Sequence, residues 1–502
     1  MGSIRLQTIG ERVVFGLAGV LVALLLLVLF MPGGSKGKGA VSAVDPSTTQ
    51  PVVSIERKLR TKGDLWEPSI AADLRGNVFA MGLRIRDVPT GGKKKATSAA
   101  ESANATAETE GESEEAERAF RRTAKLVVLR SHDDGATWGP PKEIGTPGSY
   151  DQRLETDSAG RLYGAWLDAG NNLLFARSAN HARSFTVRRM FHADGIDKVE
   201  LAVSANGRHV YVATGVDKGG ERRTLIFVSH TGGRTFNAPI SVFRARTQSL
   251  SVTADLRFKP ATGSVTSDLT VTPDGHVVLG LWTGRLTVSN DHTGTDQCRR
   301  CRYVVVTGDR FGRRFRAQTL AGVSRDRYGS IALASDEKNR VYALFPTAVE
   351  KADYPAYHLV LRVSRDGGRH FGKALRVDPR DDTVQRRYPF LAARGDGRVF
   401  AGWIDNSSAE EHWNMWGAYS GDVGATFTPP VLLSNAHGND ETGNPNGFGL
   451  FFGHYGELAW TESGVHAIWS EGSSFEGTTG EFNGQLYDSG SAFSSTVQLP
   501  KP

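Results

Sequence analysis

Polar and aromatic side chains recur just before short apolar segments of this chain. Carboxylates, guanidinium groups and phenols at such positions bind polar ligands, because each makes several directed hydrogen bonds. The same groups can instead pair with one another and close the space they share, and the sequence leaves both alternatives open. The residues concerned are Trp66, Glu67, Tyr150, Asp151, Arg153, Asp197, Lys198, Glu200, Ser267, Asp268, Arg327, Tyr328, Arg387, Tyr388, His454, Tyr455 and Glu457. Of these, we expect Glu67, Asp151, Arg153, Arg327, Tyr328, Arg387, Tyr388 and His454 to contact a ligand.

These residues belong to a repeat that occurs seven times. Each copy has a short apolar strand, a turn containing Gly or Asn, and a second strand rich in β-branched and aromatic residues. Such a pattern predicts an all-β fold built from similar sheets. The clearest copies begin at Glu67, Asp151 and Tyr388, and weaker copies begin near Lys198, Ser267, Tyr328 and Tyr455.

A second turn motif comes one strand after each of the first six copies, and its full pattern is Ser-x-Asp-x-Gly-x-Thr followed by an aromatic residue. The member at 229–236 lacks the acidic residue, and the members at 178–185 and 307–315 are degenerate. The Asp can accept hydrogen bonds from backbone N–H groups of the turn, Gly supplies a positive φ, and the aromatic ring fills the gap between neighbouring sheets. We therefore expect a structural role for the motif. Its clearest members are Ser131, Asp133, Gly135 and Trp138; Ser364, Asp366, Gly368 and Phe371; and Ser420, Asp422, Gly424 and Phe427.

This motif resembles the Asp-box (BNR) repeat of the sialidase-like β-propeller superfamily, over roughly residues 52–493. The resemblance implies that the boxes lie on the rim of a propeller, away from its axis. In a propeller the innermost strand of each blade lines a central funnel, and ligands bind where those strands begin. The polar residues named above are therefore expected at the funnel.

The resemblance also gives an expectation about catalysis. Sialidases clamp the substrate carboxylate with arginines and use a Tyr nucleophile activated by an acidic residue. Tyr455-Gly-Glu457-Leu is similar to the nucleophile motif, and Arg327 and Arg387 would supply two arginines. Trp66-Glu67-Pro68 stands where the family has Arg-Ile-Pro, and no Asp acid/base is identifiable. We expect a non-catalytic module, with exo-α-sialidase activity as the alternative.

The repeats predict seven blades within residues 51–502. The last copy, at 455–470, is followed by a short segment at 485–488 and lacks a fourth strand. Residues 52–59 precede the first copy and can supply that outer strand, which closes the ring and protects its edges. Six blades, as in catalytic sialidases, is the alternative.

The two cysteines form a Cys298-Arg-Arg-Cys301 motif before an apolar segment. A redox dithiol or half of a zinc site with His292 would require a surrounding βαβ pattern or a second pair of ligands, and the sequence has neither. A local disulfide is therefore expected, with no metal and no cofactor.

The N-terminus predicts a membrane anchor. Residues 13–31 are apolar and uncharged, long enough to cross a ~30 Å hydrocarbon core. We expect a cytoplasmic tail at 1–12, a signal-anchor at 13–31, a linker at 32–50 and an extracytoplasmic remainder. A cleavable signal peptide, with small residues at 41–43, is the alternative.

Composition excludes several other classes of protein. With 39% hydrophobic residues in a chain of 502, wholesale disorder is excluded, and 58 glycines without a three-residue period exclude collagen. A net charge of +6, dispersed along the chain, argues against nucleic-acid binding.

Two insertions interrupt the repeats. Residues 91–118 are of low complexity and are expected to form a disordered surface loop, whereas the Gly- and Asn-rich segment 437–452 is a candidate rim of a binding site. We predict a membrane-anchored propeller that binds a glycan or a protein. A structural subunit of a membrane complex is the second alternative to this function.

Overall fold

The computed structural model describes residues 50–54, 56–61, 64–85, 124–218, 221–246, 261–287, 297–326, 330–348, 357–379, 381, 383–384, 386–409, 412–434, 456–472, 480–482, 485–487 and 490–500. All of them belong to one compact unit, Ser47–Pro502. Within this part of the chain no helix is long and apolar enough to span a membrane. The predicted anchor and both insertions lie outside the described residues.

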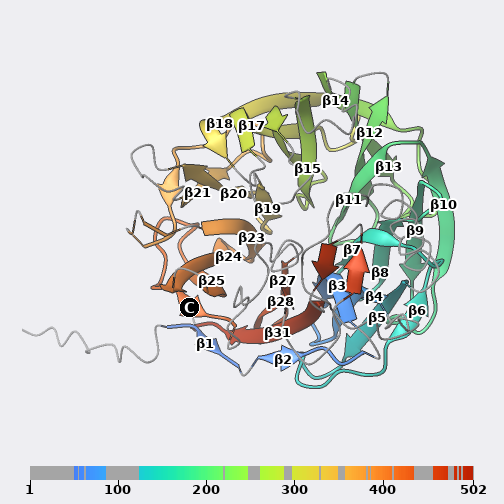
Figure 1. Ribbon diagram of the computed structural model, residues 1–502, viewed down its shortest axis with the longest axis horizontal. Helices are drawn as coiled ribbons and strands as arrows, with labels where there is room; N and C mark the ends of the chain where they lie inside the picture. The colour runs from blue at the N-terminus through green and yellow to red at the C-terminus, as the bar shows by residue number, and fades with distance from the viewer. Residues whose placement is uncertain are drawn as a thin grey trace, which may run out of the picture. The chain divides into compact units, whose positions relative to one another are not determined.

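The described residues form seven antiparallel sheets of four or five strands arranged around one axis, as Figure 1 shows, and one separate two-stranded sheet. The number of sheets confirms the seven predicted blades, so the six-bladed alternative is wrong. Blade 1 contains β3 (Asp64–Ala72), β4 (Val78–Ile85), β5 (Lys125–Ser131) and β6 (Lys142–Ile144). Blade 2 contains β7 (Tyr150–Thr156), β8 (Leu162–Leu167), β9 (Asn172–Ser178) and β10 (Thr186–His192). Blade 3 contains β11 (Ile196–Val203), β12 (Val210–Lys218), β13 (Glu221–Ser229) and β14 (Ile240–Arg246).

The next three blades follow the same order of strands. Blade 4 contains β15 (Ala261–Val271), β16 (Val277–Thr287), β17 (Gln297–Gly308) and β18 (Phe315–Asp326). Blade 5 contains β19 (Ala332–Ser335), β20 (Val341–Ala348), β21 (Tyr357–Ser364) and β22 (Leu375–Arg376). Blade 6 contains β23 (Arg386–Arg394), β24 (Arg398–Ala409), β25 (His412–Ser420) and β26 (Val431–Leu432).

Blade 7 joins the two ends of the described chain. Its strands β27 (Glu457–Trp460), β28 (Gly464–Gly472) and β31 (Gly490–Gln498) are completed by β1 (Val52–Val53) and β2 (Arg57–Lys58), which both pair with β31. The predicted closure by residues 52–59 is confirmed. The third strand of this blade is β31, because β29 (Gly480–Phe482) and β30 (Gln485–Tyr487) form a separate hairpin ahead of it.

The ring has two distinct ends. The innermost strands β3, β7, β11, β15, β19, β23 and β27 each contact the next one around the axis. We call the end where these strands begin the start end. Because each sheet is antiparallel and its strands follow one another in sequence, the second strand ends and the third begins there as well. The Ser-x-Asp-x-Gly turns connect third and fourth strands, so they lie at the opposite end, which we call the turn end.

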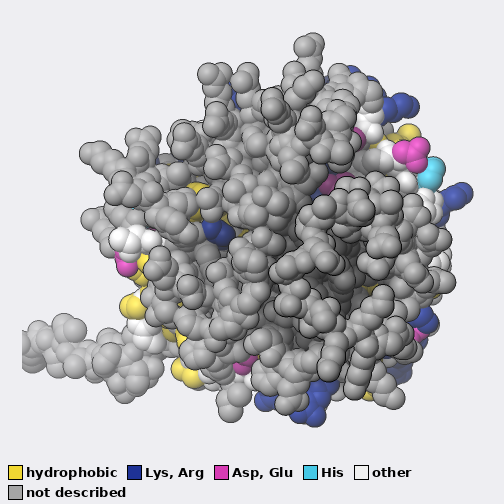
Figure 2. Space-filling view, in the orientation of Figure 1, with side chains coloured by type: hydrophobic (Ala, Val, Ile, Leu, Met, Phe, Trp, Pro, Cys, Tyr) yellow, Lys and Arg dark blue, Asp and Glu magenta, His cyan; other side chains and the backbone are white. Residues whose placement is uncertain are grey.

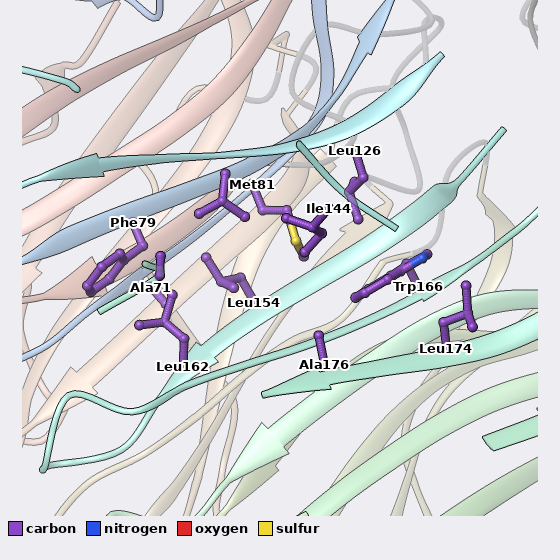
Figure 3. Packing of buried hydrophobic residues seen from close by; sticks show 12 residues of the cluster. Ala71, Phe79, Met81, Leu126, Ile144, Leu154, Leu162, Trp166, Leu174 and Ala176 are labelled. Atoms are coloured by element: carbon purple, nitrogen blue, oxygen red, sulfur yellow. The ribbon is translucent and has the colours of Figure 1, made fainter. Parts of the chain in front are cut away.

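Apolar side chains between neighbouring blades hold the ring together. Figure 3 shows one such layer, in which Phe79 and Met81 of blade 1 lie against Leu154 and Trp166 of blade 2. All four are at most 2% exposed. Burying an aliphatic or aromatic side chain of this size stabilises a fold by about 1.5–3 kcal/mol. Similar clusters occupy the other junctions described, so apolar packing stabilises the contact between each pair of neighbouring blades.

Each Ser-x-Asp-x-Gly turn is bonded internally. Asp133 accepts hydrogen bonds from Ser131 Oγ at 2.7 Å and from the backbone N–H of Thr137 at 2.8 Å. The turns at Ser364 and Ser420 have the same pattern. The aromatic residues that end these three turns, Trp138, Phe371 and Phe427, pack against the cluster between their own blade and the preceding one. These contacts support the structural role expected from the motif.

Candidate functional site

The innermost strands begin with an unusual backbone conformation. Glu67, Asp151, Lys198 and Tyr388 have φ values of 49°, 51°, 59° and 47°. In blades 1, 2, 3 and 6 the register between the first and second strands shifts at this position, which is a β-bulge. A positive φ is uncommon outside glycine, and bulges redirect side chains at the ends of sheets. The repeat therefore places equivalent residues of four blades in the same special geometry.

Hydrogen bonds connect these residues from blade to blade. The backbone N–H of Asp151 donates to Glu67 Oε2 at 2.9 Å, and the backbone N–H of Lys198 donates to Asp151 Oδ2 at 3.2 Å. Lys198 Nζ also lies 3.3 Å from Asp151 Oδ1. Glu67, Asp151 and Lys198 thus form a continuous bonded series across blades 1, 2 and 3.

Arg153 forms the centre of a second series of contacts, among blades 2, 3 and 7. Its Nε lies 2.8 Å from Glu200 Oε2 and 3.4 Å from Glu457 Oε1. Glu457 Oε2 accepts hydrogen bonds from Ser69 Oγ at 2.7 Å and from the N–H of Ile70 at 2.8 Å. The Glu200 side chain is 2% exposed, whereas that of Glu457 is 25% exposed. One cation is therefore shared between a buried carboxylate and a partly exposed one.

Burial perturbs the acidity of this cluster. Burial raises the pKa of Glu457 to about 7, although the positive charge of Arg153 lowers it in part. Burial, together with the negative charge of Asp151, raises the pKa of Glu67 to about 7. The pKa of Asp268 is raised well above its usual value by burial and by repulsion from Glu200. Burial therefore shifts each of these carboxyls toward its protonated form.

Glu155 is the member of the site that the sequence analysis missed. It follows Arg153 by two positions on β7, so both side chains lie on the same face of that strand. Burial and the charges of Glu457 and Asp268 raise the pKa of Glu155 well above its usual value. The period of two along an innermost strand was the signal that could have identified it. We refer to Glu67, Asp151, Arg153, Glu155, Lys198, Glu200, Asp268 and Glu457 as the axial cluster.

The axial cluster can both donate and accept hydrogen bonds. A protonated carboxyl donates through its O–H and accepts through its carbonyl oxygen, whereas an ionised one only accepts. Its six carboxyl groups outnumber the two cations, so the site suits hydroxyl-rich or cationic groups better than acidic ones. Among the described residues, no three His, Cys, Asp or Glu side chains are arranged to hold a metal ion.

The structure brings together only some of the predicted site residues. Glu67, Asp151, Arg153 and Glu457 lie in the axial cluster, as described above. Arg387 and Tyr388 lie half-buried at the beginning of β23. The remaining candidates fall outside the described residues, and they are Arg327, Tyr328, His454 and Tyr455.

Arg386, next to the predicted Arg387, is a buried arginine of blade 6. Its side chain is 2% exposed, and Nη1 donates to the carbonyl oxygen of Asp381 at 2.8 Å and lies 3.3 Å from Asp378 Oδ2. Alternation along β23 turns this residue toward the junction with blade 5. The sequence pattern did not predict these contacts of Arg386, which are structural.

The two cysteines both lie on β17, which begins earlier than the apolar segment had suggested. Their side chains are outside the described set, so the disulfide stays a prediction. On the face shown in Figure 2, many of the described Lys and Arg side chains lie near the edge, and others lie farther in.

Comparison with known proteins gives matches in structure only. No family model matches the chain, and neither does any curated protein. A protein of unknown function from Dyadobacter fermentans matches at 14% identity and a TM-score of 0.42, over 88% of this chain and 99% of that one. A Hadza microbial sialidase matches at 11% identity and a TM-score of 0.41, over 76% of this chain and 74% of that one.

A polysaccharide lyase, an ulvan lyase, matches at 8% identity and a TM-score of 0.45, over 82% of this chain and 93% of that one. At these identities and scores the matches carry no argument about activity. The propeller fold of this chain follows from its own strand order, and its function has to be argued from its own residues.

Proposed function

We propose that this chain is a membrane-anchored, extracytoplasmic propeller that binds a hydroxyl-rich ligand, a glycan, at the start end of its ring. The observation that carries the proposal is the convergence of Arg153, Glu200 and Glu457 from three different blades. Carboxyls with a raised pKa beside a guanidinium provide donors and acceptors within one site. Sugar hydroxyls require this combination, because each hydroxyl both donates and accepts.

The surroundings of the axial cluster support a binding role. Asp197 and Asp217 of blade 3 lie about half exposed at the start end, and both pair with Arg222. The strands β4 and β26, which precede residues 86–123 and 435–455, end at the start end. The strands β5 and β27, which follow these residues, begin at the start end. Connections at one end of a rigid scaffold are where binding residues usually concentrate.

The proposal is tested with the full chain in detergent on an array of neutral, acidic and amino glycans. Lys198→Met removes one ammonium group from the axial cluster but retains the backbone N–H that donates to Asp151. The matched control is Arg365→Gln, an exposed cation at the turn end. We expect capture of neutral glycans by the wild type and by Arg365→Gln, with at least about tenfold weaker capture by Lys198→Met. Equal capture by all three proteins would contradict a site at the start end.

Two alternatives to a glycan ligand are a protein ligand and a structural role as a subunit of a membrane complex. Both predict that stable partners co-purify with the full anchored chain and that replacement of the segment 437–452 abolishes their capture. Glycan binding without any co-purifying partner would favour the glycan form.

Exo-α-sialidase activity is a second candidate, favoured by one observation. A carboxyl with a pKa near 7, as for Glu457, is suited to proton transfer at neutral pH. In this mechanism Tyr455 is the nucleophile and Glu457 activates it, with Arg327 and Arg387 on the substrate carboxylate. Turnover of a fluorogenic α-sialoside between pH 4 and 7 that vanishes in Tyr455→Phe would establish the activity. A folded protein without turnover excludes it.

A further inference from the structure

At three blade junctions, a positively charged side chain of one blade forms a hydrogen bond to the next blade at the turn end. In each case the donor side chain lies on the outer strand of one blade. The acceptor is a backbone carbonyl oxygen in the Ser-x-Asp-x-Gly turn, or its degenerate form, of the next blade, at the sixth residue of that turn. The junctions follow one another around the ring, from blade 7 to blade 3. The bonds run from Arg57 Nη1 to Ala136 O, from Lys142 Nζ to Arg183 O, and from Arg188 Nη1 to Arg234 O.

The junction between blades 4 and 5 has a different residue at this place. Arg188 lies three positions after the aromatic residue that ends its turn, Phe185, and the corresponding position after Phe315 is Gln318. Arg188 also stacks over Phe236, 4.8 Å from the ring centre. Gln318 is too short to fill the same space. Its Oε1 is shielded from solvent and has no hydrogen-bond partner among the described residues.

A cavity of about 220 Å³ occupies this junction. Arg314 and Arg316 line it from β18 and the turn before it, and Arg369 and His370 line it from the turn of blade 5. Positions 314, 316 and 318 alternate along one face, whereas Phe315 on the other face packs into the cluster between blades 3 and 4. The basic side chains therefore face the cavity because the sheet directs them there.

The positive charge of this cavity is only partly neutralised within the described part of the chain. Asp309 lies in the lining near Arg314, and His370 Nδ1 lies 2.6 Å from Asp366 Oδ2. Asp309, the carboxylate in the lining, accepts hydrogen bonds from the N–H groups of Phe311 and Arg313 in its own turn. Arg369 Nη2 lies 3.1 Å from His276 Nε2, and the other ring nitrogen of His276 lies 2.9 Å from Asp274 Oδ1. None of the three lining arginines forms an ion pair with a described carboxylate.

We propose that this junction is a binding site for a small oxyanion: the sulfate, phosphate or carboxylate group of an acidic ligand. Planar guanidinium groups bind such groups through paired N–H donors. Gln318 can turn its amide so that NH₂ faces the anion. The cavity is smaller than the ~300–1,000 Å³ of pockets for drug-sized ligands, so it holds one acidic group with little beyond it. It lies at the turn end, and the proposal is independent of the function assigned to the start end.

The test is calorimetric titration of the full chain in detergent with sodium sulfate, inorganic phosphate and glucuronate, each at constant ionic strength. Arg316→Gln removes one donor. Gln318→Arg recreates the arrangement of Arg188 and is expected to fill the cavity and bond to the carbonyl oxygen of Arg369. Arg365→Gln is the matched control, because Arg365 is exposed and outside the lining.

We expect one saturable site for at least one of the three anions, at least about tenfold weaker in Arg316→Gln and in Gln318→Arg and unchanged in Arg365→Gln. The preferred anion identifies which acidic group the site takes. Absence of saturable binding to all three anions would overturn the proposal. So would binding that Arg316→Gln leaves unchanged, or that Arg365→Gln weakens equally, and this comparison holds even if Gln318→Arg does not fold.

Discussion

Ser69 and Glu457 join the first and last blades of the ring: Ser69 Oγ donates to Glu457 Oε2 across 2.7 Å, although 388 positions separate the two residues. The same carboxylate accepts the N–H of Ile70 and faces Arg153 of blade 2. Glu457 therefore contributes both to closure of the propeller and to the axial cluster. A carboxyl in this position couples the protonation of the site to the stability of the fold.

Stability should depend on pH through Glu457. Its pKa is raised in the folded state, so its contribution is fully present below about pH 4.5 and is lost as the pH rises through about 7. The rise from 4.5 to about 7 corresponds to at most about 3.5 kcal/mol at ~1.4 kcal/mol per pKa unit. Thermal unfolding from pH 4.5 to 8 should show a smaller loss of stability in Glu457→Gln than in the wild type. Parallel curves for the two proteins would contradict this.

Removal of Arg153 should destabilise the protein strongly. Arg153→Met leaves Glu200 buried without its cation and Glu457 without its neighbour, which costs about 3–5 kcal/mol for a buried pair. Adding Glu200→Gln should restore part of this loss, because an uncharged amide tolerates burial better. Denaturant unfolding of the two single variants and the double variant measures the coupling. Additive losses would mean that the pair does not interact.

The acidic residue of a Ser-x-Asp-x-Gly turn should contribute to stability and not to binding. Asp422 accepts three hydrogen bonds within its turn, so Asp422→Ala is expected to lower the free energy of unfolding by about 1–3 kcal/mol. Glu462→Ala, an exposed acidic residue in another turn, serves as the control and should have little effect. Loss of glycan capture in folded Asp422→Ala would contradict a purely structural role.

The N-terminal strands should be required to close the ring. A truncation that removes residues 1–49 retains β1 and β2, whereas one that removes 1–60 exposes the edge of β31 and deletes Leu59, which is 2% exposed. We expect the first to fold and the second to unfold more readily and to associate through the free edge. Size-exclusion chromatography with thermal unfolding compares them. Equal stability would show that blade 7 does not need its outer strand.

Much of the fold was predictable, because each copy of the repeat predicts the same kind of sheet. Seven copies gave seven blades, and the leftover segment at 52–59 had only one unfilled place to occupy. The positions of Glu67, Asp151 and Arg153 followed from the same alignment of copies. Glu155 and the cavity beside Gln318 could not be predicted in this way. The burial of a residue and the space left between blades depend on the neighbouring blades, and the sequence of one repeat does not contain this information.

The most direct measurement of the central claim is hydrogen–deuterium exchange of the full chain with and without a glycan captured on the array. The account predicts slower exchange at the beginnings of β3, β7, β11 and β27 and around Asp268 of β15, where the axial cluster lies, with the turn end unchanged. Protection confined to the turn end, or none at the start end despite saturating glycan, would contradict a binding site built from Arg153, Glu200 and Glu457.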